Sequence, residues 1–374
     1  MKYSVVIDQL RQQGNLRTIP SGHDSAVVDF SLNDYLGVAA EGEVQRDFFS
    51  DPHNCDISLT SSASRLLASD QKHYHALELH LAQALGKEVL LFNSGYHANT
   101  GMVSALADSD TMILADKLVH ASIIDGIMLS KAPFKRWRHN DMAHLERLLG
   151  MEADKYERVL VIVESVYSMD GDSAPLAQLV QLKKLYPNMM LYVDEAHSFG
   201  VLGRDGLGMH TLLPEPGAVD VVIGTFGKAL GSSGAFAAMS DEVRQIAVNK
   251  ARSFIFSTAL PPISCAYTLH VLRWIEAHPE VRVHLATLAE YLKNELRAKM
   301  IPVADDPRYI IPILIGDARK SVEVSRRMLD DGVKVLPIRT PTVPPGTERL
   351  RISLSASMKK EDIDLLVNSL SRAL

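Results

Sequence analysis

The sequence predicts an α/β protein with a large doubly wound domain on a mainly parallel sheet and a smaller C-terminal α+β domain. Three observations lead to this fold class. Short apolar runs alternate with helix-like stretches between residues 85 and 235, and residues 263–300 are strongly helical before further short strands follow. The 374 residues also exceed the size at which one hydrophobic core usually keeps growing. We therefore expect an N-terminal segment at 1–40, a large domain at 41–270 and a small domain at 271–374.

The predicted strands of the large domain are continuous apolar runs, each followed by a small or polar turn and a helix-like stretch. Such runs are typical of parallel strands that are covered on both faces. Ligands of such sheets bind at the carboxyl ends of the strands, so the residues after each run are the candidates for a site. The runs are Glu88–Phe92, Thr111–Ala115, Val159–Val163, Met189–Val193 and Val219–Ile223.

The small domain is predicted from shorter signals. Tyr309–Gly316 and Leu350–Ser355 are the expected strands, and Ser321–Gly332 is the expected helix between them. The proline-rich segment Ile338–Arg351 is expected to be a rigid extended loop that carries polar residues.

Composition excludes several function classes. The formal net charge of −6 offers no long-range attraction for nucleic acid or for an anionic membrane. No stretch approaches the roughly 18 continuous apolar residues of a membrane span, and we expect a cytoplasmic protein. Cys55 and Cys265 are too few for a disulfide framework and are expected to be small buried hydrophobes.

Groups suited to a phosphorylated ligand follow the predicted strands. Gly95 and Tyr96 open a helix-like stretch, where backbone N–H groups and the helix N-terminus favour a phosphate. Thr225 follows a later run and is placed to donate its hydroxyl to the same phosphate. His120 follows the run at residues 111–115 and, taken alone, is as typical of a packed structural histidine as of a ligand contact.

Asp194 comes directly after an apolar run, with His197 three residues later. A carboxylate at that position is either functional or a helix cap. Facing a pyridine nitrogen, it would keep that nitrogen protonated and make the ring an electron sink. Unit charges about 3 Å apart at an effective dielectric near 20 attract by roughly 5 kcal/mol before desolvation is subtracted. At about 1.4 kcal/mol per pKa unit, half of that attraction holds the proton at neutral pH.

Lys228 lies between Gly227 and Ala229 in a glycine-rich turn after the last apolar run. A Schiff-base lysine needs close approach of a ring, which small neighbours permit, and a depressed pKa, which a desolvated site supplies. From this turn alone, a solvated surface lysine remains the alternative. Together with the other strand-end groups, Lys228 predicts a bound pyridoxal 5′-phosphate.

Three other functions are disfavoured by missing residues. The tetrapeptide Asp194–His197 spells the DEAH of nucleic-acid helicases, but neither Gly-Lys pair of the chain lies in a phosphate-binding G-x-x-x-x-G-K-[ST] loop. No predicted strand is followed by the G-x-G-x-x-G of dinucleotide oxidoreductases. His73, His75 and His80 lack the H-E-x-x-H order, and His75 would face away from the others on a helix, so no metal site is expected.

Six motifs along nearly the whole chain resemble one family. The sequence is similar to the α-oxoamine synthases, fold-type I pyridoxal phosphate enzymes that join an amino acid to an acyl thioester with loss of CO₂. The motifs are SLNDYLG (31–37), HASIIDG (120–126), SVYSMDGDSAPL (165–176), VDEAHSFGVLGRDGLG (193–208), GTFGKALG (224–231) and FIFSTALPP (254–262).

Within this family, residues 168–176 and 341–356 most resemble members that condense L-alanine with a pimeloyl thioester of coenzyme A or acyl carrier protein. The alternative is the glycine C-acetyltransferases, which use glycine and acetyl-CoA. A third alternative, a catalytically silent cofactor-binding protein, is disfavoured by the complete set of Lys, Asp, His and Arg residues.

The resemblance implies a role for each cofactor residue. Lys228 would carry the Schiff base, Asp194 would face the pyridine nitrogen, and His120 would stack on the ring. His197 and Ser168 would contact the O3′ side of the cofactor. The phosphate would be bound by Gly95, Tyr96 and Thr225, and by Thr258 of a neighbouring subunit, so the resemblance implies a homodimer with shared active sites.

The resemblance also implies substrate contacts. Arg351 would bind the carboxylate of the amino acid, with Asn33 helping. Arg17 would meet the far carboxylate of the pimeloyl chain, and Thr342 would lie near the acyl group. One departure stands out, because the family usually carries a glycine-rich run where this chain has LTSSA at residues 59–63.

Overall fold

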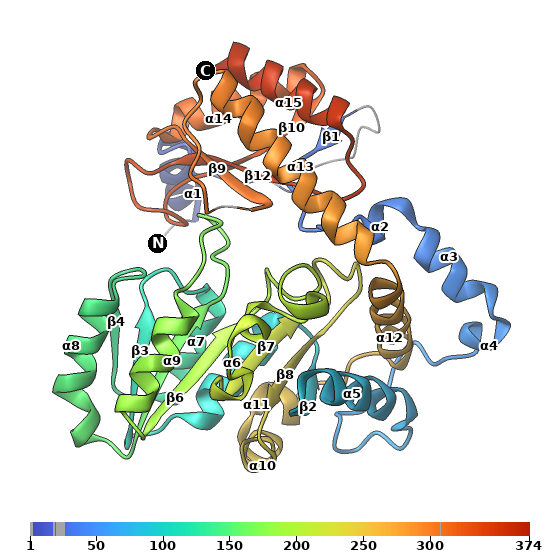
Figure 1. Ribbon diagram of the computed structural model, residues 1–374, viewed down its shortest axis with the longest axis vertical. Coiled ribbons are helices and arrows are strands. Elements are labelled where there is room, and N and C mark those ends of the chain that lie inside the picture. The colour runs from blue at the N-terminus through green and yellow to red at the C-terminus, as the bar shows by residue number, and fades with distance from the viewer. Residues whose placement is uncertain (1–2, 18, 20–26, 307) are drawn as a thin grey trace. The chain divides into compact units, whose positions relative to one another are not determined.

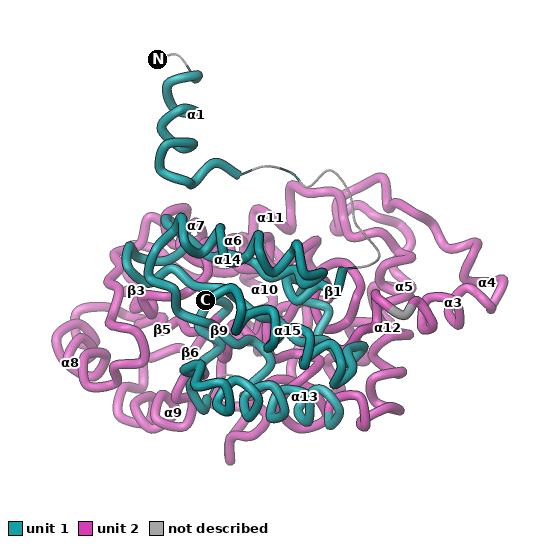
Figure 2. The backbone as a smooth tube through the Cα atoms, turned by 90° about the horizontal axis from the view of Figure 1, so that it is seen from above, with its two compact units in different colours: residues 1–35, 168–172, 283–374 teal, residues 36–167, 173–282 magenta. Residues whose placement is uncertain are grey.

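The computed structural model describes residues 3–17, 19, 27–306 and 308–374, and the chain divides into two compact units (Figure 1, Figure 2). Unit 1 comprises residues 1–35, 168–172 and 283–374, and unit 2 comprises residues 36–167 and 173–282. The chain passes between the units after residues 35, 167, 172 and 282. The N-terminal segment joins unit 1 because β1 (Val28–Asp29) pairs in parallel with β10 (Val333–Lys334).

Unit 2 is built on a seven-stranded sheet with the strand order β2-β8-β7-β6-β5-β3-β4. β8 runs antiparallel to both of its neighbours, and the other adjacent pairs are parallel. The predicted fold class is confirmed. The strands are β2 (Glu88–Phe92), β3 (Thr111–Asp116), β4 (Phe134–Trp137), β5 (Arg158–Glu164), β6 (Met189–Asp194), β7 (Val221–Thr225) and β8 (Ala235–Met239).

The strand β8 was not predicted. Its sequence, AFAAM, is rich in alanine, which is depleted in strands. All five of its residues are buried, and the strand is held by antiparallel pairing with both β2 and β7. Tertiary context, rather than local preference, therefore decides this element.

Helices cover both faces of the sheet (Figure 1). The helix α6 contacts β2, β7 and β8 and packs against α7, α10 and α11. The helix α8 contacts β3 and β4, and α9 contacts β6. α5 contacts β2 and packs against α12. The helices of unit 2 are α2 (Val38–Glu41), α3 (Glu43–Ser50), α4 (Pro52–Cys55), α5 (Lys72–Leu85), α6 (Gly95–Leu106), α7 (Ala121–Ser130), α8 (Met142–Glu152), α9 (Leu176–Leu185), α10 (Asp241–Lys250), α11 (Arg252–Ile255) and α12 (Pro262–Ala277). The short 3₁₀ helices are η1 (Ala153–Lys155), η2 (Arg204–Gly206), η3 (Met209–Leu212) and η4 (Pro216–Ala218).

Side chains of the central strands alternate between the two faces of the sheet. One hydrophobic core contains alternate strand residues together with the inner faces of α6 and α7. Continuing the same alternation, the last residues of β5, β6 and β7 point toward the face that α6 covers. The residues that point toward this face are Leu160, Ile162 and Glu164 in β5, Tyr192 and Asp194 in β6, and Val221, Ile223 and Thr225 in β7.

Unit 1 contains a three-stranded antiparallel sheet with the order β11-β12-β9. Residues 168–172 belong to this unit, and a Cβ atom on Gly171 (φ 70°) would lie only 2.0 Å from the Ile310 carbonyl oxygen. Only glycine therefore fits where residue 171 approaches the backbone of Ile310. The strands are β9 (Ile310–Leu314), β11 (Leu336–Ile338) and β12 (Arg349–Ser353), and the helices are α1 (Tyr3–Gln12), α13 (Pro279–Ala298, which begins in unit 2), α14 (Ala318–Asp330) and α15 (Lys360–Ala373).

The described residues contain no helix that is long and apolar enough to cross a membrane. They also contain no cluster of three or more His, Cys, Asp or Glu side chains able to hold a metal ion. Cys265 is buried as expected, but Cys55 is exposed, because it ends the short helix α4 at the surface.

Candidate cofactor and substrate sites

A cavity of about 150 Å³ lies in unit 2 at the carboxyl ends of the central strands. Glu164, Asp194 and Thr225 end β5, β6 and β7 and reach it by the alternation described above. The cavity therefore brings together most of the predicted cofactor residues. It is lined by Gly95, Tyr96, Asn99, His120, Ser122, Glu164, Asp194, Ala196, His197, Thr225 and Lys228.

Asp194 is held in one orientation by neighbours from two elements. Its Oδ2 accepts a hydrogen bond from Asn99 Nδ2 at 2.7 Å, and its Oδ1 accepts the Ala196 backbone N–H at 2.9 Å. Asn99 is itself oriented, because its Oδ1 accepts the Tyr192 hydroxyl at 2.7 Å. With only 3% of its surface exposed, Asp194 is a buried carboxylate with charge-stabilising donors, as a partner for a protonated ring nitrogen requires.

Lys228 Nζ lies 2.8 Å from His197 Nε2. Both residues lie in loops that follow adjacent strands, so the amine and the imidazole meet at the sheet edge. The loop after Asp194 is anchored by Glu195, whose carboxylate accepts the backbone N–H groups of Met209 at 3.0 Å and His210 at 2.7 Å. Glu195 points into the protein rather than into the cavity, which fits a structural role.

His120 caps the N-terminus of α7. Its Nδ1 accepts the Ser122 backbone N–H at 3.2 Å and lies 2.8 Å from the Ser122 hydroxyl oxygen, which in turn accepts a hydrogen bond from Asn99 Nδ2 at 3.0 Å. Because Nδ1 is an acceptor, the proton of the neutral ring sits on Nε2. Desolvation lowers the pKa of His120; Asp194 opposes this shift and Lys228 adds to it. The ring is thus favoured in the uncharged form that stacking on a heteroaromatic ring requires.

The N-terminus of α6 faces Thr225. Ser94 caps the helix, and a Cβ atom on Gly95 would lie 3.7 Å from the Thr225 Cβ atom. The first backbone N–H groups of α6, next to Thr225, lack partners within the helix and favour an anion. The Tyr96 side chain turns to Asp125, to which its hydroxyl donates, so only its backbone is available to a phosphate.

This set of groups fits pyridoxal 5′-phosphate. A capped helix N-terminus, a glycine and a threonine hydroxyl suit a phosphate, a buried carboxylate suits a pyridinium nitrogen, and a lysine amine suits an aldehyde. One further observation points to a ligand. Glu164 Oε1 is buried and has no hydrogen-bond partner within the described residues, although it lines the cavity. A buried polar atom left unsatisfied costs about 1–3 kcal/mol, so a bound polar molecule is its natural partner.

Arg351 forms the centre of a second cluster, in unit 1. Its guanidinium donates to the Ser168 carbonyl at 2.6 Å, to Ser353 Oγ at 2.7 Å and to Asn33 Oδ1 at 3.0 Å, with Tyr35 Oη at 3.4 Å. Burial raises the pKa of Tyr35 to about 12, with Arg351 acting in the opposite direction. Within the described residues, all of these partners are neutral. Arg351 is only 3% exposed, so its positive charge lacks a paired anion, which is the property of a carboxylate-binding arginine.

The structure brings Arg17 and Thr342 together, 325 positions apart in the chain, through a hydrogen bond of 3.0 Å from the guanidinium to Thr342 Oγ1. Both residues are exposed in unit 1. Ser168 also belongs to unit 1, where its carbonyl contacts Arg351, and it does not line the unit 2 cavity.

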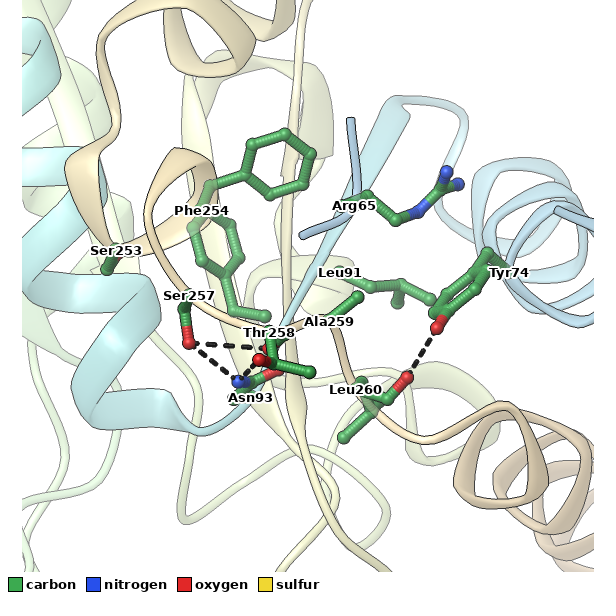
Figure 3. A pocket seen from close by; sticks show the side chains of 11 residues that line it. Arg65, Tyr74, Leu91, Asn93, Ser253, Phe254, Ser257, Thr258, Ala259 and Leu260 are labelled. Carbon is green, nitrogen blue, oxygen red and sulfur yellow. Dashed lines mark hydrogen bonds between the residues drawn. The ribbon is translucent and has the colours of Figure 1, made fainter. Parts of the chain in front are cut away.

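Thr258 does not line the cavity that contains Lys228 of the same chain. Figure 3 shows it in a separate small pocket of unit 2, where Asn93 Nδ2 donates to the Thr258 carbonyl at 2.7 Å and to Ser257 Oγ at 3.0 Å. Thr258 also forms a β-bridge with Ser64. Ser62, within the segment that departs from the family, adopts a φ of 51°, a left-handed conformation that glycine accommodates more easily.

The sequence analysis missed four residues that line the cavity, namely Asn99, Ser122, Glu164 and Ala196. It also missed Tyr192, which does not line the cavity but donates to Asn99. Glu164 carried a usable signal, since it comes directly after the predicted strand Val159–Val163, in the position that Asp194 has after its own strand. Asn99 lies four residues after Gly95 and so on the same helical face. For Tyr192 the sequence offers only a buried strand position.

The chain is similar in sequence and fold to known proteins. The family model described as aminotransferase class I and II matches residues 25–370. A relative from Haemophilus ducreyi named 8-amino-7-oxononanoate synthase is 42% identical over 375 residues, which cover 96% of this chain and 97% of the relative.

Two solved structures show the same fold. Serine palmitoyltransferase from S. paucimobilis, with a bound PLP-myriocin aldimine, has a TM-score of 0.90 at 26% identity and covers 99% of this chain and 96% of its own. The crystal structure of 8-amino-7-oxononanoate synthase from Francisella tularensis has a TM-score of 0.78 at 26% identity and covers 93% of this chain and 98% of its own.

Proposed function

The chain belongs to the aminotransferase class I and II family and, within it, to the α-oxoamine synthases, and from that premise we propose that it condenses L-alanine with a pimeloyl thioester. The products would be 8-amino-7-oxononanoate, CO₂ and a free thiol, a step of biotin biosynthesis. The observation that carries the proposal is that one cavity holds Lys228, His197 and the buried Asp194, with Lys228 Nζ 2.8 Å from His197 Nε2. The name of the H. ducreyi relative supports the choice of substrates.

The protein is a pyridoxal 5′-phosphate-dependent enzyme of the acyltransferase type. The bound cofactor supplies an electron sink for breaking bonds at the α-carbon of an amino acid. Lys228 would hold the cofactor covalently, while α6 and Thr225 would bind its phosphate. Asp194, fixed by Asn99, would keep the ring nitrogen protonated.

Lys228 has a second role in the proposed reaction. With its amine free, Lys228 would take the proton from the α-carbon of the amino acid and later return one. His197 Nε2, at 2.8 Å, would orient that amine. His120, uncharged at neutral pH, would stack on the ring and exclude water from one face.

The amino-acid carboxylate would bind to Arg351, with Asn33 holding the guanidinium in place. Arg17 and Thr342 would meet the far end of the acyl chain, where pimeloyl carries a carboxylate and acetyl carries none. Thr258 would act on the phosphate of a neighbouring subunit, which makes a homodimer part of the proposal.

The direct test supplies the holoenzyme with L-alanine or glycine and with thioesters of different chain length on coenzyme A and on acyl carrier protein. Product masses then identify both substrates. We expect the mass of 8-amino-7-oxononanoate from L-alanine and a pimeloyl thioester. Faster formation of 2-amino-3-ketobutyrate from glycine and acetyl-CoA would overturn the proposal.

A further inference from the structure

Glu164 lies beside Asp194 in the cavity, and the proposed reaction gives it no role. The two residues end the adjacent parallel strands β5 and β6 and are register partners. Both point toward the face that α6 covers, both line the cavity, and each is only 3% exposed. The floor of the cavity therefore holds a pair of carboxyl groups, not a single one.

The two carboxyl groups have different surroundings. Asp194 accepts two hydrogen bonds, from Asn99 Nδ2 and from the Ala196 backbone N–H, and both favour its charged form. Glu164 accepts from the His120 backbone, and its Oε1 has no donor within the described residues. Two neighbouring buried carboxylates repel each other, so one of them keeps its proton. Glu164 lacks comparable donors, and its burial beside Asp194 favours its protonated form.

Three charged groups and one backbone N–H group, from four parts of the chain, act on Glu164. Burial and then Asp194 hold the pKa of Glu164 well above its usual range. Lys228, from the loop after β7, and the His120 backbone N–H act in the opposite direction, while Asp116 at the end of β3 adds to the increase.

We propose that Glu164 is a cofactor-site residue that stays uncharged at neutral pH, so that Asp194 carries the only negative charge of the pair and Glu164 Oε1 remains to hydrogen-bond the bound cofactor. This inference rests on the proposed function only through pyridoxal 5′-phosphate and not through the acyl donor. It explains why a buried polar atom that lacks a protein partner lies at this position. It also confines the negative charge of the cavity floor to the carboxylate that Asn99 orients.

The test compares cofactor binding in three full-length variants: Glu164→Gln, Glu164→Leu and Asp194→Asn. Each is stripped of cofactor and titrated with pyridoxal 5′-phosphate, and binding is followed by protein fluorescence and by the visible absorbance. Glutamine mimics an uncharged glutamate, so Glu164→Gln is expected to bind within about threefold of wild type. Loss of one hydrogen bond, about 1.4 kcal/mol, makes Glu164→Leu about tenfold weaker. Asp194→Asn is expected to show the largest loss.

Two results would overturn the proposal. Weakening of Glu164→Gln to the level of Asp194→Asn would mean that Glu164 carries a charge. Wild-type affinity in Glu164→Leu would mean that Oε1 does not contact the cofactor. Because neither readout involves an acyl thioester, an error in the assigned acyl donor leaves this test unaffected.

A spectroscopic measurement on the wild-type holoenzyme covers the case in which a variant fails to fold. Absolute infrared spectra are recorded at pH 6 and at pH 8 and compared with those of Asp194→Asn at the same pH values. A protonated-carboxyl band that persists at both pH values supports the proposal. Its absence, with carboxylate bands alone, would overturn it.

Discussion

The cavity of unit 2 and the arginine cluster of unit 1 position their charged groups in opposite ways. In unit 2, Tyr192 donates to Asn99, which donates to Asp194, and Lys228 lies within hydrogen-bond distance of His197. Most polar groups of this site therefore have partners within the protein. In unit 1, Arg351 is just as buried but is surrounded by neutral partners. Under the proposed function, the protein itself would satisfy most groups of the cofactor site, whereas the substrate carboxylate would neutralise the charge of Arg351.

The largest effect is expected when Lys228 is replaced with alanine. The substitution removes both the covalent attachment and the base, so we expect no measurable turnover and no visible absorbance from linked cofactor. Arg351 is untouched, and the amino acid should still bind unit 1. Absorbance spectra and product formation from L-alanine give the readout. Full alanine-dependent activity in this variant would contradict the role of Lys228.

Replacing Arg351 with lysine tests the other side of the comparison. The charge remains, but the planar fork that binds a carboxylate with two parallel hydrogen bonds is lost. We expect the KM for L-alanine to rise about 10- to 100-fold, as for the loss of a hydrogen bond to a charged group. The affinity for pyridoxal 5′-phosphate serves as the control and should change less than about twofold. An unchanged KM with weakened cofactor binding would reverse the assignment of the two regions.

The buried Glu164 of unit 2 predicts that the stability of the protein depends on pH. The raised pKa of Glu164 means that the folded protein binds one more proton than the unfolded chain above the ordinary glutamate pKa. Stability is therefore lost as the pH rises toward the folded pKa, by up to about 1.4 kcal/mol per pH unit. Glu164→Gln removes this term. Denaturant unfolding of the cofactor-free protein should show the variant gaining stability over wild type between pH 5 and pH 8. A pH-independent difference would contradict the prediction.

The smallest effect is expected at Arg17, because this guanidinium is exposed and an exposed charge contributes little. For Arg17→Gln we expect the KM for a pimeloyl thioester to rise about two- to fivefold, in line with the 0.2–1 kcal/mol typical of exposed ion pairs. An acyl thioester without a distal carboxylate provides the matched control and should be unaffected. Equal changes for both substrates would remove Arg17 from acyl recognition.

Strand ends and glycine-rich turns made much of the unit 2 site predictable. Asp194, Thr225 and Lys228 follow apolar runs, and parallel strands bring their carboxyl ends to one edge. Tyr192 and Asn99 were not predictable, because their roles depend on which face of a buried strand or helix meets Asp194. β8 was missed for a related reason, since its alanine-rich sequence forms a strand only between β2 and β7. Contacts such as Arg17–Thr342, which join distant segments, have no local signal.

The most direct test of the account is to locate the covalent link. Reduction of the holoenzyme with borohydride fixes a Schiff base as a stable secondary amine, and peptide mass spectrometry then identifies the modified residue. The account predicts a single phosphopyridoxyl group on Lys228. A modification on another lysine, or a holoenzyme that carries no lysine modification after reduction, would contradict it.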